Sequence, residues 1–520
     1  MSSVVVLGSG AAGLAAAVAA ASAGARVTVL EATATVGGTT ALSGGVAWVP
    51  VNHRAAEAGF EDDAGSALTY LRGLQLGDTD DLLLERFVGR GAAVLEAIER
   101  TTPIRWRAIG YPDYHAPRPG GRTGGRSVEP DPIALPAAEA GRVREPVSWR
   151  LRATQDELIR GTFRRATGEQ RERDGIQTMG RALTAGQFLG AREAGVEVRT
   201  GVRATALHTE GGRVVGVETE EGPVEGAVVL ATGGFERDRA LVSTFLRAPV
   251  VGLTGGPGAR GDGLRMAMRA GAALGTMSEA WWAPTVQLPG SEIEGEPLAH
   301  LLLAERGRPG SLMVDQRGRR FCNEAQNYND VGRSLHAFDP GGFRFERDPA
   351  WLVVDGAYRE RFPLGPVLPG EALPEGWHEA EDAAGLAALT GLPVEALTST
   401  LERYNTYAAR GEDPDFGRGE SVYDRFVGDR RAEHPNLRPL EGRLTAVPVG
   451  AGTLGTKGGA RTDQDGRVRH LDGGVIPGLY AAGNAAASPL GMLYPGAGGT
   501  IGPALVFGHL AGETAATDAG

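Results

Sequence analysis

A tyrosine stands just before a glycine-rich turn close to the C-terminal end of the chain. Tyr494 is followed by Gly498 and Gly499, and a helix is predicted to start near Thr500. The Tyr494 O–H and the bare Gly498 N–H could together bind a carbonyl oxygen. Such a pair of donors lowers the barrier to an enolate, because both hydrogen bonds strengthen as negative charge develops on that oxygen. The alternative is that Tyr494 only packs and that the glycines only make room for a bound cofactor.

A second chemical signal lies near the N-terminus, where a strand, a glycine turn, a helix, a strand and an acid follow one another. Residues 4–7 are an apolar run typical of a buried parallel strand. Gly8 permits a tight turn, Gly10 lets a pyrophosphate approach the backbone, and Gly13 lets the helix pack closely on the strand. The helix N-terminus offers N–H groups to phosphates, and Glu31 would accept hydrogen bonds from ribose hydroxyls. This order predicts a dinucleotide-binding fold.

Further glycine segments identify the predicted dinucleotide as FAD. A glycine loop at 37–45 follows closely on the acid, which is typical of flavoproteins, and 228–234 and 478–484 each read as a strand entering a glycine turn. The loop 37–45 contains no histidine, so the FAD is expected to be bound non-covalently. The predicted cofactor-binding residues are Gly8, Gly10, Ala12, Gly13, Glu31, Gly38, Thr39, Thr40, Ser43, Gly44, Gly45, Val202, Ala231, Thr232, Gly233, Gly483, Asn484, Gly499 and Ile501.

The distribution of these signals predicts an α/β protein with two domains. A discontinuous Rossmann-like FAD-binding domain is expected to comprise residues 1–275 and 445–520, and an inserted α+β substrate domain residues 276–444. Residues 50–195 read as mainly helical, with a long Pro/Gly-rich loop at 110–147. A loop of this length is expected to cover an active site or to form an oligomer contact.

Two short segments between these regions also bear on the cofactor. Residues 196–198 and 203–207 are expected to form a short strand pair, with the backbone of Val202 or Arg203 touching the adenine.

The run 317–320 is expected to be a solvated turn.

The composition disfavours several classes of function. The chain has 520 residues and a net charge of −11, which argues against nucleic acid or an anionic membrane surface as the main partner. Cys322 is the only cysteine, so an internal disulfide is impossible, and a reducing compartment, the cytoplasm, is expected. Its thiol is expected to be buried and inert. The histidines show no metal-ligand spacing, and no apolar run reaches about 18 residues, so neither a metal site nor a transmembrane helix is predicted.

On its motifs the chain resembles the 3-ketosteroid Δ1-dehydrogenases of the fumarate reductase/succinate dehydrogenase flavoprotein superfamily. The matching segments span nearly the whole chain, and two of them are the more discriminating: RFCNEAQNY at 320–328 and YPGAG at 494–498. The glycine motifs place only the superfamily. The matching segments are 8–13, 37–45, 112–114, 313–328, 454–459 and 494–503.

The resemblance implies a role for each of four residues. Tyr494 and the Gly498 N–H would bind the C3 carbonyl of a small apolar ketone and promote its enolisation. Tyr328 would take a proton from C2, and Tyr114 would hydrogen-bond Tyr328 and help it to ionise. A hydride would leave C1 for flavin N5, giving the 1,2-unsaturated ketone, and an external acceptor such as a quinone would take the electrons. Whether Tyr114 or the nearby Tyr111 is the helper is left open.

The substrate also remains open. His115, Arg118, Arg122 and Arg126 place positive charge beside Tyr114, which indicates either a mobile surface loop or a substrate with an anionic or polar group. A dehydrogenase or ene-reductase of a non-steroidal enone or natural-product ketone is the main rival. A fumarate reductase is disfavoured because 483–503 holds no Arg or His to clamp a dicarboxylate. A flavin-dependent isomerase or a purely binding flavoprotein is the remaining alternative.

Overall fold

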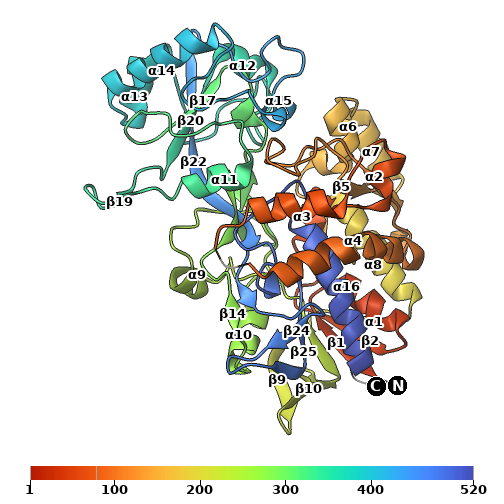
Figure 1. The fold of residues 1–520 in the computed structure, drawn as a ribbon. Helices are drawn as coiled ribbons and strands as arrows, with labels where there is room; N and C mark the ends of the chain where they lie inside the picture. The colour runs from red at the N-terminus through yellow and green to blue at the C-terminus, as the bar shows by residue number, and fades with distance from the viewer. Residues whose placement is uncertain (1, 78, 519–520) are drawn as a thin grey trace. The chain divides into compact units, whose positions relative to one another are not determined.

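The computed structural model describes residues 2–77 and 79–518, which divide into two compact units (Figure 1). The first unit comprises Met1–Arg247, Gly255–Ala280 and Gly455–Gly520. The second comprises Ala248–Thr254 and Trp281–Leu454. Each unit is therefore assembled from stretches that lie far apart in the sequence.

A six-stranded sheet forms the centre of the first unit. Its order is β24-β25-β12-β1-β2-β8, with parallel pairing throughout except between β24 and β25. The middle strands are runs of buried Val and Leu, as expected for a parallel sheet that is covered on both faces. The strands are β1 (Ser3–Leu7), β2 (Arg26–Glu31), β8 (Glu197–Thr200), β12 (Ala227–Leu230), β24 (Arg467–Arg469) and β25 (Val475–Ala481).

The helices α1 (Ala11–Ser22) and α16 (Ile501–Asp518) lie side by side in the same unit (Figure 1). They approach closely because α1 is almost entirely alanine and α16 carries glycines at the contact. A Cβ atom on Gly508 would lie 2.4 Å from the Ala12 carbonyl oxygen, and one on Gly512 would lie 2.1 Å from that of Ala16. Only glycine fits at these two positions without a shift of the backbone.

Smaller elements complete the first unit. Its other strands form short sheets: β9 (Ala204–Glu210), β10 (Arg213–Thr219) and β11 (Gly222–Glu225); β3 (Ala47–Trp48), β4 (Trp106–Ala108) and β5 (Ser127–Pro130); β6 (Ile133–Ala134) and β7 (Ile176–Gln177); β14 (Leu274–Gly275) and β23 (Gly459–Ala460). Its other helices are α2 (His53–Glu57), α3 (Ala64–Gly73), α4 (Asp81–Thr101), α5 (Ala137–Ala140), α6 (Gln155–Arg160), α7 (Arg165–Arg173), α8 (Met179–Glu193), α9 (Arg239–Phe245) and α10 (Asp262–Arg269), with 3-10 turns at Thr40–Leu42, Trp149–Arg152 and Gly483–Ala485.

The second unit is built on a sheet with the path β16-β15-β22-β20-β17, and β13 and β21 also pair with β22. Side chains that alternate along β20 enter two different cores. Leu352 packs in one core with Met313 and Val447, and Val353 packs in the other with Leu397. The strands are β13 (Gly252–Leu253), β15 (Ala280–Ile293), β16 (Glu296–Leu301), β17 (Ser311–Val314), β20 (Ala350–Asp355), β21 (His378–Ala380) and β22 (Leu444–Thr456), with a hairpin of β18 (Phe338–Asp339) and β19 (Arg344–Phe345).

Helices cover this second sheet. The longest, α14, supplies Leu397 and Leu401 to the core that Val353 enters. The helices are α11 (Tyr328–Ser334), α12 (Gly356–Arg361), α13 (Ala383–Thr390), α14 (Val394–Ala408) and α15 (Val422–Val427), and Glu305–Gly307 is a 3-10 turn.

Two local expectations need correction. The strands expected near 196–207 exist as β8 and β9, but they do not pair with each other: β8 extends the central sheet beside β2, and β9 pairs with β10. The stretch 110–147 is not one continuous loop, because it contains β5, β6 and α5. The partners of β8 and β6, namely β2 and β7, lie far away in the sequence and cannot be read from local pattern.

Candidate active site and cofactor cradle

The N-terminal glycine turn has the geometry that a dinucleotide needs. Gly8 has φ of 99°, and a Cβ there would lie 2.4 Å from the Ala231 carbonyl oxygen. A Cβ on Gly13 would lie 1.9 Å from the Gly8 carbonyl oxygen, so close packing of α1 requires glycine. Gly10 differs, because its nearest neighbour would be 3.5 Å away, at Thr40 Oγ1. The open side of Gly10 is where a pyrophosphate could approach the backbone.

Glu31 ends β2 and is buried beside this turn. Its Oε2 accepts hydrogen bonds from the Ser9 N–H at 3.1 Å and from Ser9 Oγ at 2.6 Å. Its Oε1 accepts from the Thr33 N–H at 2.9 Å and from Thr33 Oγ1 at 2.7 Å. These four bonds fix the carboxylate at the carboxyl end of the strand, where a ribose would bind in a fold of this kind.

The second glycine loop lies against the first. A Cβ on Gly38 would be 3.8 Å from the Gly10 Cα, and the Ala11 N–H at the start of α1 donates to Thr40 Oγ1 at 3.0 Å. Thr39 Oγ1 accepts from the Gly256 N–H at 3.0 Å. The loop therefore faces the N-terminus of α1, with its own hydroxyl groups within the cradle.

Three more of the predicted cofactor residues, Ala231, Gly483 and Val202, lie at this edge of the sheet. Ala231 follows β12, and Gly483 follows β25. A Cβ on Gly483 would lie 2.9 Å from Ala12 Cβ, and the Val202 N–H donates to the Glu31 carbonyl oxygen at 3.0 Å. Ligands of open α/β sheets bind at the carboxyl ends of the strands, so the residues present fit FAD.

The Tyr494–Gly499 turn is held against β3. Gly498 has φ of 94°, its carbonyl oxygen accepts from the Trp48 N–H at 3.0 Å, and a Cβ on it would be 2.5 Å from the Val46 carbonyl oxygen. Within residues 2–77 and 79–518 the Gly498 N–H has no hydrogen-bond acceptor. Tyr494 is 4% exposed, and its O–H accepts from Thr500 Oγ1 at 3.4 Å. A phenol and a backbone N–H thus stand in one tight turn.

Tyr114 packs on Tyr494. The two rings are 5.2 Å apart at 62°, and the Tyr114 N–H donates to the Pro495 carbonyl oxygen at 2.9 Å. The Tyr111 ring is also near Tyr114, with the two ring centroids 6.5 Å apart. The structure therefore brings together Tyr114, Tyr494 and Gly498 from segments that are far apart in the sequence.

Tyr328 belongs to the other compact unit. It is the first residue of α11, is 8% exposed, and follows Asn327, whose side chain caps the helix by accepting from the Asp330 N–H. The preceding Arg320 contradicts the expectation of a solvated turn at 317–320. Its side chain is 5% exposed and pairs with Glu324 at 2.7 Å and with Asp413 at 2.9 Å.

Two titratable groups near Tyr328 have displaced pKa values. Burial would raise the pKa of Glu324, but the guanidinium groups of Arg320 and Arg418 lower it to about 2. Burial raises the pKa of the Cys322 thiol to about 12, so this thiol is inert, as the sequence predicted.

The positive charge that the sequence places near Tyr114 is largely balanced. Arg126 pairs with Asp62 and Asp113, each at 2.7 Å, and Arg122 pairs with Asp63 at 3.1 Å. Burial raises the pKa of Asp113 to about 6, against the opposing effect of Arg126. Sequence reasoning noted these arginines but missed their partners. The presence of several aspartates in the same region was the available signal.

Glu236 is a second buried acid that sequence reasoning missed. Its Oε2 accepts from the Thr456 N–H at 3.3 Å, and its Oε1 would be 3.2 Å from a Cβ on Gly255, which also faces Thr39. Burial raises the pKa of Glu236 to about 6. The signal was an acid directly after the 233–234 glycine turn.

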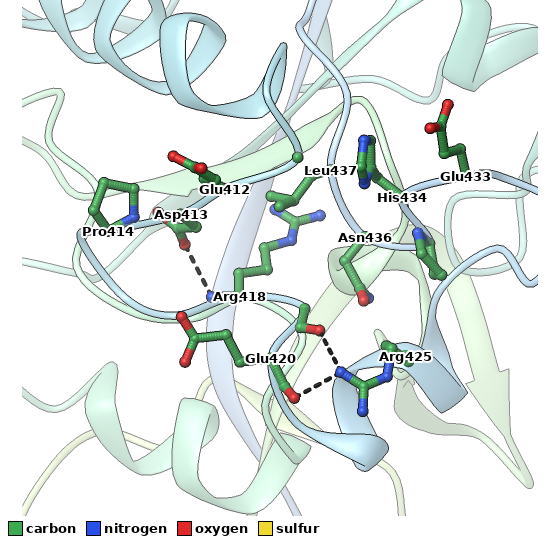
Figure 2. Close-up of a pocket in the computed structure, with 13 residues that line it drawn as sticks. Glu412, Asp413, Pro414, Arg418, Glu420, Arg425, Glu433, His434, Asn436 and Leu437 are labelled. Carbon is green, nitrogen blue, oxygen red and sulfur yellow. Dashed lines mark hydrogen bonds between the residues drawn. The ribbon is translucent and has the colours of Figure 1, made fainter.

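A cavity of about 520 Å³ lies in the second unit, among residues 411–437 (Figure 2). Glu412, Glu420 and Glu433 line it with His434, and Arg425 donates to two backbone carbonyl oxygens at its edge. Apolar ligands bind in pockets with mainly apolar linings, so this charged cavity does not suit an apolar ketone. None of the predicted site residues lines it.

The helices in the described part of the chain include none that is both long and apolar enough to cross a membrane. Residues 2–77 and 79–518 contain no group of three or more His, Cys, Asp or Glu side chains placed to hold a metal ion.

The central sheet and its glycine cradle define a dinucleotide-binding flavoprotein fold. Residues 3–501 match the family model described as "FAD binding domain". The chain belongs to this family, and the predicted α/β fold, the FAD cofactor and the class of FAD-dependent oxidoreductase are confirmed.

Relatives of known activity cover the whole chain. A "4-oxocyclohexanecarboxylate 2-dehydrogenase" of Sinomonas cyclohexanicum is 41% identical, over 99% of this chain and 93% of the relative. A "3-oxosteroid 1-dehydrogenase" of Mycolicibacterium smegmatis is 38% identical, over 99% of this chain and 97% of the relative. Among solved structures, the 3-ketosteroid delta1-dehydrogenase from Sterolibacterium denitrificans is similar with a TM-score of 0.91 and 31% identity, over 99% of this chain and 100% of that one. The family resemblance predicted from the motifs is confirmed.

Proposed function

We propose that the protein desaturates a cyclic ketone next to its carbonyl group, with a 3-ketosteroid as the preferred substrate and the 1,2-bond as the site of reaction. The observation that carries this proposal is the ring pair of Tyr114 and Tyr494 beside the Gly498 N–H, which has no acceptor among the described residues. These groups suit a ketone oxygen, and the turn contains no cation that would bind a dicarboxylate.

The chain's own residues divide the work between binding and proton transfer. Tyr494 O–H and the Gly498 N–H hold the C3 oxygen, and both bonds strengthen as that oxygen becomes negative. Tyr328 takes the C2 proton, with Tyr114 as its hydrogen-bonding helper. Tyr114 is preferred over Tyr111 because its ring packs directly on Tyr494. FAD, when bound, accepts the hydride that leaves C1.

The cost of ionising Tyr328 must be met locally. A free tyrosine has a pKa of about 10, so its ionisation near pH 7 costs about 4 kcal/mol. Polarisation of the substrate carbonyl makes the C2 proton more acidic and so reduces the demand on the base. We further propose that FAD is held without a covalent bond, that an external acceptor such as a quinone takes the electrons, and that the protein acts in the cytoplasm.

A second candidate is favoured by one comparison. The relative from Sinomonas cyclohexanicum, named for 4-oxocyclohexanecarboxylate, is 41% identical, slightly above the steroid dehydrogenase of Mycolicibacterium smegmatis at 38%. The same two donors would bind the ketone of that smaller ring, and a cation would be needed for its carboxylate.

Anaerobic bleaching of the oxidised flavin separates the candidates. We expect 4-androstene-3,17-dione to bleach the flavin absorbance with the 1,4-diene as product, and 4-oxocyclohexanecarboxylate to bleach it slowly or not at all. Bleaching by the cyclohexanone alone would transfer the assignment to the second candidate. If no ketone bleaches the flavin, the protein is not a ketone dehydrogenase.

A further inference from the structure

We propose that Asp113 is a positioning residue, which holds Tyr114 against Tyr494 through a buried ion network with Arg126 and Asp62. This inference rests on the proposed function, since it assigns Asp113 a role in placing the carbonyl-binding tyrosine and its neighbour. Asp113 immediately precedes Tyr114, so the hydrogen bonds that hold Asp113 in place also restrain the Tyr114 backbone.

Every contact of the Asp113 carboxylate is made inside the first unit. The residue is 1% exposed. Its Oδ1 accepts from Trp48 Nε1 at 2.8 Å, and its Oδ2 accepts from Arg126 Nη1 at 2.7 Å and from the Arg122 N–H at 2.9 Å. The Asp113 N–H in turn donates to the Arg122 carbonyl oxygen at 2.9 Å. The carboxylate is thus fixed by three donors and cannot rotate without breaking one of them.

Arg126 extends the network to a second carboxylate. It is 1% exposed, and its Nε and Nη2 donate to the two oxygens of Asp62 at 3.0 and 2.7 Å. Its guanidinium also lies over the rings of Trp48 and Tyr70, at 5.7 and 5.4 Å from their centroids. A planar guanidinium that pairs on its edge and stacks on its face has one allowed orientation.

The same group of residues grips the turn that carries Tyr494. The Pro495 carbonyl oxygen accepts from the Tyr114 N–H at 2.9 Å and from Tyr70 O–H at 2.6 Å. Ser127, next to Arg126, donates its hydroxyl to the Ala497 carbonyl oxygen at 2.8 Å. Trp48 donates to Asp113 through its indole N–H, and its backbone N–H donates to the Gly498 carbonyl oxygen. One network therefore sets both sides of the Tyr114–Tyr494 pair.

Stability alone is a weak reason for such a network. Taking carboxylates and a guanidinium out of water costs several kcal/mol per ion, and well-packed apolar side chains often stabilise a core as well or better. Precise placement is a benefit that apolar packing supplies less strictly, and a misplacement of about 1 Å can cost a catalytic step about 100-fold.

The test compares D113N with the control D63N. Asp113→Asn keeps an acceptor for Trp48 but turns an NH2 group towards the Arg126 and Arg122 donors. Asp63 also contacts Arg122, but it is an exposed helix cap, and Asn caps helices about as well. With kcat counted per bound FAD, we expect D113N to lose about 10- to 100-fold with a change in KM below about threefold, and D63N to match wild type. Equal kcat values in the two variants would overturn the proposal.

A second variant separates position from charge. Asp113→Glu keeps the charge but displaces the carboxylate by one methylene group in a crowded place, since a Cβ on Gly496 would already be 3.4 Å from Asp113 Oδ1. We expect D113E to bind FAD and still to lose at least about tenfold in kcat. Recovery to the wild-type kcat would mean that charge balance alone matters, and the positioning role would be withdrawn. This comparison decides the matter if D113N does not fold.

Amide hydrogen exchange gives a readout that does not depend on turnover. Loosening of the network should speed exchange in peptides covering 110–118 and 491–500 in D113N but not in D63N, because the Tyr114 N–H loses its fixed acceptor. If none of the ketones tested reduces the flavin of the wild-type protein, the proposed function fails. The positioning role of the network is then tested by amide exchange alone. Unchanged exchange in D113N would then refute it.

Discussion

Tyr494 combines a packing ring with a donor O–H. A substitution that removes only the hydroxyl oxygen distinguishes these two roles. Y494F removes the hydroxyl but keeps the ring against Tyr114 and Gly499. We expect the variant to bind FAD normally and to lose about 100- to 1,000-fold in kcat, as for the loss of one donor to a developing oxyanion. Single-turnover flavin reduction, followed by absorbance, measures this loss.

Y480F is the matched control for that change. Tyr480 on β25 also donates its hydroxyl, to Asp518 Oδ2 at 2.9 Å, and Asp518 in turn pairs with Arg467 at 2.8 Å. Its loss should lower stability by about 1–3 kcal/mol and leave kcat unchanged. A Y494F enzyme as active as Y480F would contradict the two-donor role.

Glu236 allows a prediction about pH and stability. Its pKa in the folded protein is raised by burial from 4.5 to about 6, with hydrogen bonds from the backbone opposing the shift. An acid of this kind contributes stability that is fully present below its unfolded pKa and is lost as pH rises through the folded pKa. E236Q, which never ionises, should therefore be more stable than wild type at pH 8, by about 2 kcal/mol, and should lose this advantage near pH 4.

Denaturant unfolding of the apoprotein at several pH values measures the difference. Glu225 on β11 is exposed, and E225Q serves as the control, with the pH dependence of wild type. An E236Q variant that is less stable than wild type at pH 8 would show that the ionised carboxylate is needed for the fold.

The sequence predicted the role of residues whose backbone conformation is set by a short local pattern. It did not predict the burial of residues whose partners lie elsewhere in the chain. Gly8, Gly10 and Gly13 report the backbone conformation of their own turn, which a short pattern specifies. Arg320 was expected in a solvated turn and Arg126 in a surface loop or beside a polar substrate group, although Arg320 pairs with Glu324 and Asp413, and Arg126 with Asp62 and Asp113. An ion pair across many residues leaves no periodic signal, so burial of these arginines could not be inferred.

At the scale of elements, the contact between α1 and α16 leaves no room for a side chain at Gly512. An alanine at Gly512 would place its Cβ 2.1 Å from the Ala16 carbonyl oxygen, so the two helices must move apart. Because α1 begins at the turn that is predicted to bind the phosphates, G512A should weaken FAD binding at least about tenfold and lower the unfolding temperature by several degrees. Titration of the apoprotein with FAD, followed by fluorescence, measures the affinity.

Gly89 supplies the control for this prediction. It lies inside α4, and a Cβ there would meet nothing within 4 Å. G89A should raise stability by about 0.5–1 kcal/mol, because alanine is the better helix former, and should leave FAD affinity unchanged. If G512A behaved like G89A, the helices would be free to separate without consequence for the cofactor.

Elements that follow a known local pattern were recognised from the sequence, whereas the pairing of strands in a sheet was not. The order strand, turn, helix, strand identified β1, α1 and β2 directly. The two strands near 196–207 were expected to pair because they are adjacent in sequence. In the structure β8 instead completes the parallel sheet, with Val29 opposite Val198, and a register across 169 residues cannot be seen in either segment alone.

At the scale of the whole molecule, FAD binding is predicted to involve only the first unit. The predicted FAD residues all fall in Met1–Arg247 or Gly455–Gly520. Bound FAD should therefore stabilise the first unit by about 2.7 kcal/mol at a free concentration 100 times Kd. Removal of FAD should speed amide exchange in peptides from the first unit, and peptides within 281–454 should exchange as before. A uniform change across both units would contradict this division.

The domain boundaries at 275 and 445 remain predictions. They were placed where FAD signals stop, and the compact units change at Ala280 and at Leu454. Sequence motifs mark ligand contacts, whereas compactness depends on packing, so the two criteria need not agree to the residue. The tyrosines illustrate the same point, because motifs could name Tyr114, Tyr328 and Tyr494 but could not show which of them share a unit.

The late position of α16 in the chain has a consequence for biosynthesis. The helix supports α1 through Gly508 and Gly512, and β25 and Gly483 complete the cradle from the same final stretch. During synthesis we expect the alanine face of α1 to stay uncovered until α16 has also emerged from the ribosome. Flavin loading should then follow synthesis of α16, and chaperones that shield small apolar faces would favour its yield.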